Sequence, residues 1–224
     1  MVLFVKADLE GEAAFSLVKR VREIAEAYYP GQWLLAGEGV STCDMRETVV
    51  SDMTKVNLIA IAAVFIVLLF SFKSLSLPVI LVLAIEAGIW VNTAIPYFTN
   101  QSVFYISYLI IFSIQLGATV DYAILFTDRY IEFRRSLQKK QAIVQTVSSV
   151  TVSILTSGLA LTVVGFLMGY ISTHGLLSQL GFFLGRGALL SMGIVLFALP
   201  GMLYLLDGLI ERTTKNAVFV KKGE

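Results

Sequence analysis

Five long apolar stretches constrain the fold of this chain more than any other feature. A helix that crosses a bilayer needs about 20 mostly apolar residues in a row. Stretches of this kind occur at residues 56–72, 78–98, 103–127, 149–170 and 180–206. Only 15% of the residues are charged, against about 25% in an ordinary soluble domain. The sequence therefore predicts an all-α membrane domain of five transmembrane helices over residues 55–210.

The same composition argues against two other classes of protein. Disordered chains combine low hydrophobicity with high charge, whereas 57% of this chain is hydrophobic. A nucleic-acid partner is not expected, because a net charge of +1 leaves little positive charge to neutralise phosphates. Cys43 is the single cysteine, so the fold does not depend on an intramolecular disulfide. The lipid bilayer is the expected partner of most of the chain.

Lysine and arginine are concentrated on one side of the predicted spans. The connections at 99–102 and 172–175 hold none, whereas those on the other side and the C-terminal tail hold ten: Lys73, Arg129, Arg134, Arg135, Lys139, Lys140, Arg212, Lys215, Lys221 and Lys222. Cytoplasmic loops carry such an excess. We therefore expect a multi-pass protein of the cell membrane, with residues 1–54 outside and a cytoplasmic basic tail at 211–224. Residues 128–142 are predicted to form a basic interfacial helix, attracted by anionic lipids.

Residues 1–54 have the pattern of a small α/β unit. Short apolar runs at Val2–Lys6 and Trp33–Leu35 predict strands, and Glu10–Tyr28 and Ser41–Lys55 have helical spacing. Pro30 and Gly31 between them indicate a turn. A unit of this size is too small to bury a good core. We therefore expect it to be the end of a larger domain.

Three charged side chains fall inside the predicted spans, where each costs at least ~2.5–3.5 kcal/mol and suggests a function. Glu86 is equally consistent with a structural carboxylate hydrogen-bonded to a neighbouring span and with a functional role. Arg186 is better explained by snorkelling to the outer interface. Asp121 could snorkel toward Arg129, but a function is favoured because Tyr122 is adjacent and the next span offers hydroxyls. Gly117, one turn before Asp121, would let another helix approach.

Small residues mark the last two spans. Ser149, Ser153 and Thr156 share one helical face, which suits either a proton path or close packing, and packing is the simpler explanation. Gly165-x-x-x-Gly169 and Gly181-x-x-x-Gly185 are further packing signals.

No pattern in the chain indicates enzymatic activity, a metal site or a bound cofactor. A phosphate-binding loop is absent from the sequence, and the single histidine, His174, cannot build a histidine-rich metal site. An intramembrane hydrolase would need a nucleophile beside a base, and Ser157 has no histidine near it in the sequence.

Several segments resemble the MMPL exporters of the resistance-nodulation-division (RND) superfamily. Gln115–Phe126, which contains Gly117-Ala118-Thr119-Val120-Asp121-Tyr122, is similar to the fourth helix of that family, and Asp128-Arg129-Tyr130 follows it as in the family. Thr156-Ser157-Gly158-Leu159 resembles the fifth helix, and Gly185–Ser191 with Leu199-Pro200 resembles the sixth. Ala36-Gly37-Glu38 with Asp44 and Asp52 resembles the end of the outer porter domain.

The resemblance implies a function and a set of residues. In these exporters each half has one helix, a large outer domain and five further helices, so the chain would be the end of one outer domain and helices two to six. It would belong to a proton-motive-force-driven exporter of lipids or other hydrophobic compounds, with protons as the coupling ion. Asp121 would carry the proton and Tyr122 would hydrogen-bond it, supported by Ser153, Thr156, Glu86 and Arg186. The second half of the transporter, or another protomer, would complete the relay. The alternative is a sterol-sensing-like membrane receptor or scaffold that transports nothing.

Overall fold

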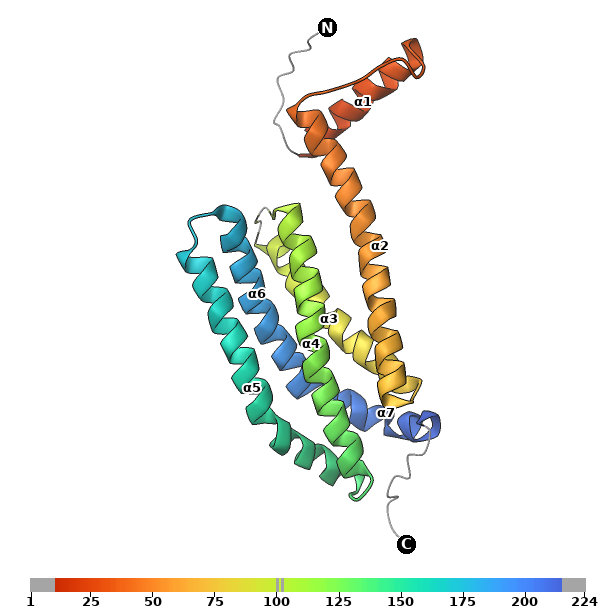
Figure 1. Ribbon diagram of the computed structural model, residues 1–224, viewed down its shortest axis with the longest axis vertical. Coiled ribbons are helices and arrows are strands. Elements are labelled where there is room, and N and C mark those ends of the chain that lie inside the picture. The colour runs from red at the N-terminus through yellow and green to blue at the C-terminus, as the bar shows by residue number, and fades with distance from the viewer. Residues whose placement is uncertain (1–10, 100, 102, 215–224) are drawn as a thin grey trace. The chain divides into compact units, whose positions relative to one another are not determined.

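The computed structural model of the protein describes residues 11–99, 101 and 103–214, and the regular elements in these ranges are helices (Figure 1). The chain separates into two compact units, Met1–Val56 and Asn57–Glu224. The helices follow in the order α1 (Glu12–Tyr28), α2 (Glu38–Phe72), α3 (Ser76–Phe98), α4 (Tyr105–Arg134), α5 (Lys139–Ile171), α6 (Gly175–Gly193), a π-helical segment η1 (Ile194–Ala198) and α7 (Leu199–Thr213).

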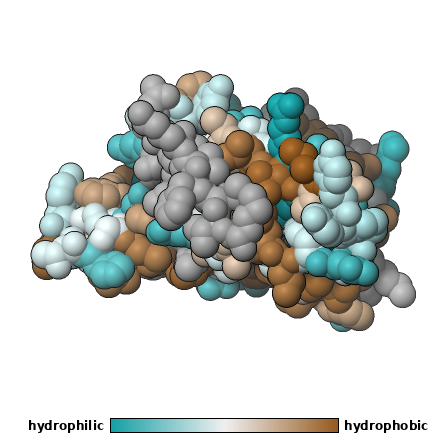
Figure 2. Space-filling model, turned by 90° about the horizontal axis from the view of Figure 1, so that it is seen from above, coloured by the Kyte–Doolittle hydropathy of each residue, from teal (hydrophilic) through white to brown (hydrophobic). Residues whose placement is uncertain are grey.

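The predicted membrane helices are confirmed. Within the described ranges, five helical stretches are long and apolar enough to cross a membrane: Glu38–Phe72, Ser76–Phe98, Ile110–Arg134, Lys139–Ile171 and Gly175–Thr213. Many large hydrophobic side chains of these helices are exposed, among them Phe70, Trp90 and Phe197, and hydrophobic residues lie between hydrophilic ones in the view of Figure 2. Apolar side chains on the outside suit a bundle that faces lipid rather than water.

The α/β character predicted for residues 1–54 is not found in the described part of this segment. Helix α1 and the start of α2 confirm the two predicted helices. Trp33–Leu35 was wrongly predicted as a strand: it is irregular, and Leu34 is fully exposed. A strand needs a neighbour for its backbone groups, and residues 11–56 contain none. The predicted strand at Val2–Lys6 lies outside the described residues.

Charged contacts hold α1 to the start of α2. Arg22 donates a hydrogen bond to Asp44, and this bond raises the pKa of the Arg22 guanidinium above its ordinary value. The Arg46 guanidinium lies 4.6 Å from the centre of the Phe15 ring. These contacts are mostly exposed, so each contributes little to stability.

The core of the second unit is built mainly by α3, α4, α5 and α7. Its fully buried side chains include Leu81 and Ile85 of α3, Phe126 of α4 and Leu203 of α7. Helix α2 reaches this core only near its C-terminal end, with Leu68 and Phe72 buried and Ala60 and Val64 partly so. These four residues are four apart, so they form one narrow stripe on the helix.

Glycines bring α5 and α6 into backbone contact, as the spacing predicted. A Cβ atom added to Gly165 would lie 2.4 Å from the backbone nitrogen of Gly185, and one added to Gly181 would lie 2.3 Å from that of Gly169. Such distances leave no room for any side chain at these positions. The two Gly-x-x-x-Gly pairs therefore form the crossing between the helices.

The last predicted span is one long helix with a defect. Its 39 residues extend about 58 Å at 1.5 Å per residue, whereas the hydrocarbon core is about 30 Å thick. The π-helical segment η1 interrupts it just before Pro200, which has no N–H for a helical hydrogen bond. The helix changes direction between α6 and α7 (Figure 1). A bend at this defect is the expected way to fit such a length to a bilayer.

The basic segment at 128–142 is not a helix of its own, contrary to the prediction. Helix α4 continues to Arg134, a turn follows, and α5 begins at Lys139. The reason is packing: Tyr130 and Ile131 extend the buried face of α4, and Ala142 starts that of α5. The end of the bundle where α4 ends and α5 begins is called the basic end below.

Candidate functional site

Asp121 lies on an exposed stripe of α4. Ile110, Ile114, Gly117 and Asp121 are exposed along one side of this helix, while Gln115 and Thr119 are buried on another side. A Cβ atom at Gly117 would have no neighbour within 4 Å. The stripe is therefore open to a further helix that the described residues do not provide.

Within the described part of the chain, Asp121 has no partner for its charge. Among the described residues, its carboxylate accepts no hydrogen bond and forms no ion pair. Tyr122 is half-buried and packs against the hydrophobic core instead of bonding to Asp121. Arg129, two turns further on, pairs with Glu132 at 2.7 Å. The structure leaves Asp121 accessible and unpaired.

The predicted hydroxyl stripe on α5 does not join another helix within the described chain. Ser149, Ser153 and Thr156 are exposed. Ser149 donates to the carbonyl of Thr146, and Thr156 donates to that of Val152. Their bonding is therefore local to α5, as is common for hydroxyls in helices.

Arg186 is anchored inside the bundle by a network that was not predicted from the sequence. Its Nε donates to Oδ1 of Asn92 at 2.9 Å, and its guanidinium lies 4.8 Å from the Phe183 ring centre. The Nδ2 of Asn92 donates to Oε1 of Gln115 at 2.7 Å and to the Phe183 carbonyl at 3.2 Å. Gln115 donates in turn to the Gly88 carbonyl. The network links α3, α4 and α6, which snorkelling alone would not do.

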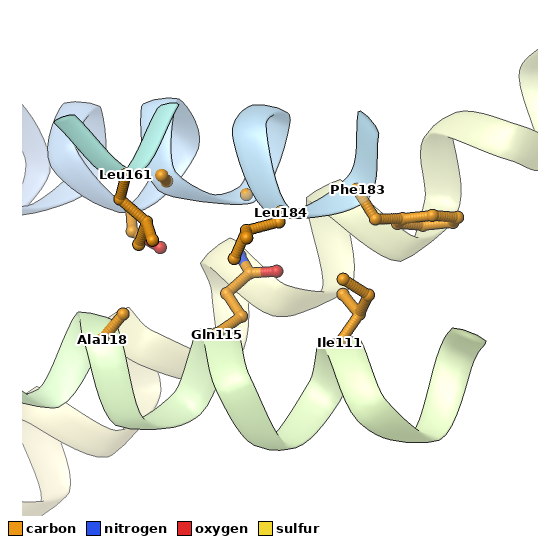
Figure 3. Close-up of a pocket in the computed structure, with 9 residues that line it drawn as sticks. Ile111, Gln115, Ala118, Leu161, Phe183 and Leu184 are labelled. Atoms are coloured by element: carbon orange, nitrogen blue, oxygen red, sulfur yellow. The ribbon is translucent and has the colours of Figure 1, made fainter. Parts of the chain in front are cut away.

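A second contact fixes α4 against α6 one turn further along. Thr119 and Ser191 share a hydrogen bond of 2.6 Å and are both almost fully buried. Gly187 makes room for the network, because a Cβ atom there would lie 2.8 Å from Nδ2 of Asn92 and 2.9 Å from Oε1 of Gln115. Figure 3 shows Gln115 extending from α4 toward Leu184, beside a cavity of about 10 Å³. We call Asn92, Gln115, Thr119, Arg186 and Ser191 the polar network.

Glu86 is buried, but its carboxylate has no hydrogen-bond partner among the described residues. The residue is 8% exposed. An ionised carboxylate without a partner is very costly in an apolar environment. The hydrogen bond to a neighbouring span that a structural role would require is therefore not present in the described chain. Within that part of the chain, no contact joins Glu86, Asp121 and Arg186.

A second buried charge cluster, also unanticipated, lies at the basic end. Asp207 of α7 accepts hydrogen bonds from Nε and Nη2 of Arg134, both at 3.0 Å, and from the Tyr130 hydroxyl at 2.5 Å. All three residues are at most 5% exposed. From its place in the sequence, Arg134 was predicted only as a loop cation. The i, i+4 spacing of Tyr130 and Arg134 was the available signal, but Asp207 is 77 and 73 residues away from them in the sequence.

Hydroxyl groups tie the end of α7 to the connection between α2 and α3. Ser76 and Thr213 share a hydrogen bond of 2.6 Å, and Thr214 donates to Ser74 at 3.0 Å. Ser74 and Thr214 also form an isolated β-bridge. The connection turns sharply at Lys73, whose φ of 49° is in the left-handed region.

Comparison with known proteins agrees with the fold and the sequence motifs. The profile of the MMPL family matches residues 1–218, nearly the whole chain. A search of curated proteins gives no match. The family match and the five apolar helices together describe a multi-pass membrane protein. The chain belongs to the MMPL family.

Proposed function

We propose that this protein is part of a proton-motive-force-driven exporter of lipids or other hydrophobic compounds, in which Asp121 takes up and releases the coupling proton. The observation that carries the proposal is the exposed position of Asp121 in the middle of an apolar helix, on the same stripe as Gly117. A charge at such a depth is costly and is retained for a function. Membership of the MMPL family supports export as that function.

The stripe would be covered by a second helix. An aspartate that faced lipid would cost at least ~2.5–3.5 kcal/mol, and Gly117 leaves room for close approach by another backbone. We propose that this helix comes from the rest of the transporter or from another copy of the chain. Tyr122 would then bond across the interface, since it has no partner among the described residues.

Protonation would act by changing the packing of α4. Neutral Asp121 can pack against an apolar neighbour, whereas ionised Asp121 needs a polar partner or water. The two forms therefore favour different arrangements of the helices, and the proton gradient would drive the exchange between them. Ser153 and Thr156 would offer hydroxyls to the opposing surface, because both are exposed on α5. Arg186 would support the relay by holding α4 in register, and Glu86 would be a second acid within the bundle.

Replacing Asp121 with asparagine in the full-length protein tests the proposal. Asparagine keeps the size of the side chain and removes the titrating group, so proton-driven export should fall to the background level. The measurement is proton movement and substrate efflux in reconstituted vesicles with an imposed pH gradient. Asp128→Asn is the matched control, because Asp128 is exposed on the same helix, and it should transport normally. Unchanged proton dependence in Asp121→Asn would refute the relay and favour the receptor or scaffold alternative.

A further inference from the structure

We infer that α7 is the element that couples α4 to α2, through one side-chain cluster on its buried face and one at its end. The first cluster, called the latch, is Tyr130, Arg134 and Asp207. The second, called the clasp, is Ser74, Ser76, Thr213 and Thr214. The inference rests on the proposed function, because it assigns the route by which a movement of α4 reaches the rest of the chain.

The latch joins α4 and α7 too strongly for them to separate in a working cycle. Arg134 and Asp207 form a two-point ion pair that is almost fully buried, and the Tyr130 hydroxyl fills a further acceptor position on Asp207. Separating such a pair would leave both charges buried without a partner, which is strongly unfavourable. The basic end of α4 and the middle of α7 therefore move together.

The polar network provides the point about which α4 can tilt. It holds α4 to α3 and α6 at Gln115 and Thr119. Arg134 is fifteen residues beyond Thr119, about 22 Å along the helix. A small tilt about the network is thus largest at the latch.

The π-helical segment η1 allows α7 to follow this movement while α6 stays in place. Helix α6 is fixed to α5 by the backbone contacts of Gly165, Gly169, Gly181 and Gly185. Between α6 and the latch the helix passes through Ile194–Ala198 and Pro200, where regular hydrogen bonding is interrupted. The hinge between the fixed α6 and the moving α7 therefore lies at η1.

The clasp passes the movement on to α2. It bonds the C-terminal end of α7 to the residues that directly follow Phe72, the last residue of α2. In the second unit α2 packs against the hydrophobic core through the stripe that ends in Leu68 and Phe72, while Leu58 and Ile59 are each 68% exposed. Helix α2 is continuous over 35 residues, from Glu38 in the first unit to Phe72 in the second. A displacement of the C-terminal end would therefore act directly on α2.

Distance measurements between spin labels in the full-length protein test the coupling directly. One label is placed on α7 by Arg212→Cys and its partner on α5 by Val144→Cys, both exposed positions, in a background from which the native cysteines, Cys43 among them, have been removed. A second pair joins Arg212→Cys to Leu75→Cys beside the clasp. Between alkaline and acidic pH, the α5–α7 distance should change and the clasp distance should stay constant. The change should be absent when Asp121 is replaced with asparagine.

Latch variants give an independent measurement. Arg134→Gln should reduce export about 2- to 30-fold, the range of mutations that modulate coupling, while carbodiimide labelling of Asp121 keeps its pH dependence. The exchanged pair, Arg134→Asp with Asp207→Arg, should recover export. Arg135→Gln is the matched control, since Arg135 is exposed next to Arg134. Thr213→Val weakens the clasp without leaving a buried charge, so it remains informative if Arg134→Gln does not fold.

The outcomes separate the two proposals. Suppose that Asp121→Asn abolishes export. A constant α5–α7 distance, or full export by both Thr213→Val and Arg134→Gln, would then overturn the coupling role of α7 and leave the proposed function intact. Normal export by Asp121→Asn would overturn the proposed function itself.

Discussion

Gly165→Ala is expected to lower the free energy of unfolding by about 3 kcal/mol, at the upper end of the usual cost of overpacking. The added methyl carbon would lie 2.4 Å and 2.6 Å from backbone atoms of Gly185, and 3.0 Å from the carbonyl oxygen of Gly181. Backbone atoms cannot rotate away as a side chain can, so α5 and α6 must separate along their whole crossing. The loss can be measured by denaturant titration of the purified protein in detergent.

Gly193→Ala is the matched control for this substitution. A Cβ atom at Gly193, at the C-terminal end of α6, has no neighbour within 4 Å. Alanine is a better helix former than glycine by about 1 kcal/mol, so this variant should be as stable as the wild type or slightly more so. Equal stability of Gly165→Ala and Gly193→Ala would show that the helices do not cross at the glycines. Combining Gly165→Ala with Gly181→Ala should cost less than the sum of the two, because both changes act on one crossing.

The elements of the membrane fold could be predicted from the sequence because lipid imposes simple rules. A helix must be long and apolar to cross a bilayer, and this requirement located all five stretches. Glycines four residues apart similarly indicated close helix packing in the last two spans, since small residues are what permits backbone contact, and the structure shows that the two pairs meet each other. The same rules fail outside the membrane, and Trp33–Leu35 is an example: an apolar run of three residues forms a strand only if a neighbouring strand exists.

The candidate sites were predictable only in part, because charge and spacing are local but partners are not. Asp121 was identified by its charge within an apolar stretch, and the structure exposes it on one stripe with Gly117. Asn92 and Gln115 carry no charge, so nothing in the sequence marks them as costly inside a membrane. Asp207 and Arg134 lie where apolar stretches end, a place where charged residues are ordinary. Only the three-dimensional packing of α4 against α7 reveals that this pair is buried.

The polar network is predicted to be as sensitive as the glycine crossing. Asn92→Leu is expected to cost about 3 kcal/mol of stability, because each buried polar group left without a partner costs about 1–3 kcal/mol. Asn92 is fully buried and satisfies Oε1 of Gln115, Nε of Arg186 and the carbonyl of Phe183 at the same time. Leucine has a similar volume, so the loss would come from the hydrogen bonds rather than from a cavity. Denaturant titration in detergent measures it.

Thr93→Val separates this effect from the general cost of removing a polar group from α3. Thr93 is the next residue, and its hydroxyl donates only to carbonyls of its own helix, those of Ile89 and Trp90. Valine has the same shape and leaves no group of another helix unpaired, so this variant should lose well under 1 kcal/mol, less than a typical buried hydrogen bond contributes. Adding Gln115→Leu to Asn92→Leu removes one of the orphaned partners and should recover part of the stability, since apolar replacement of both partners is nearly neutral. If the double variant is less stable than Asn92→Leu alone, Gln115 stabilises the packing of α4 through its bond to the Gly88 carbonyl and not through Asn92.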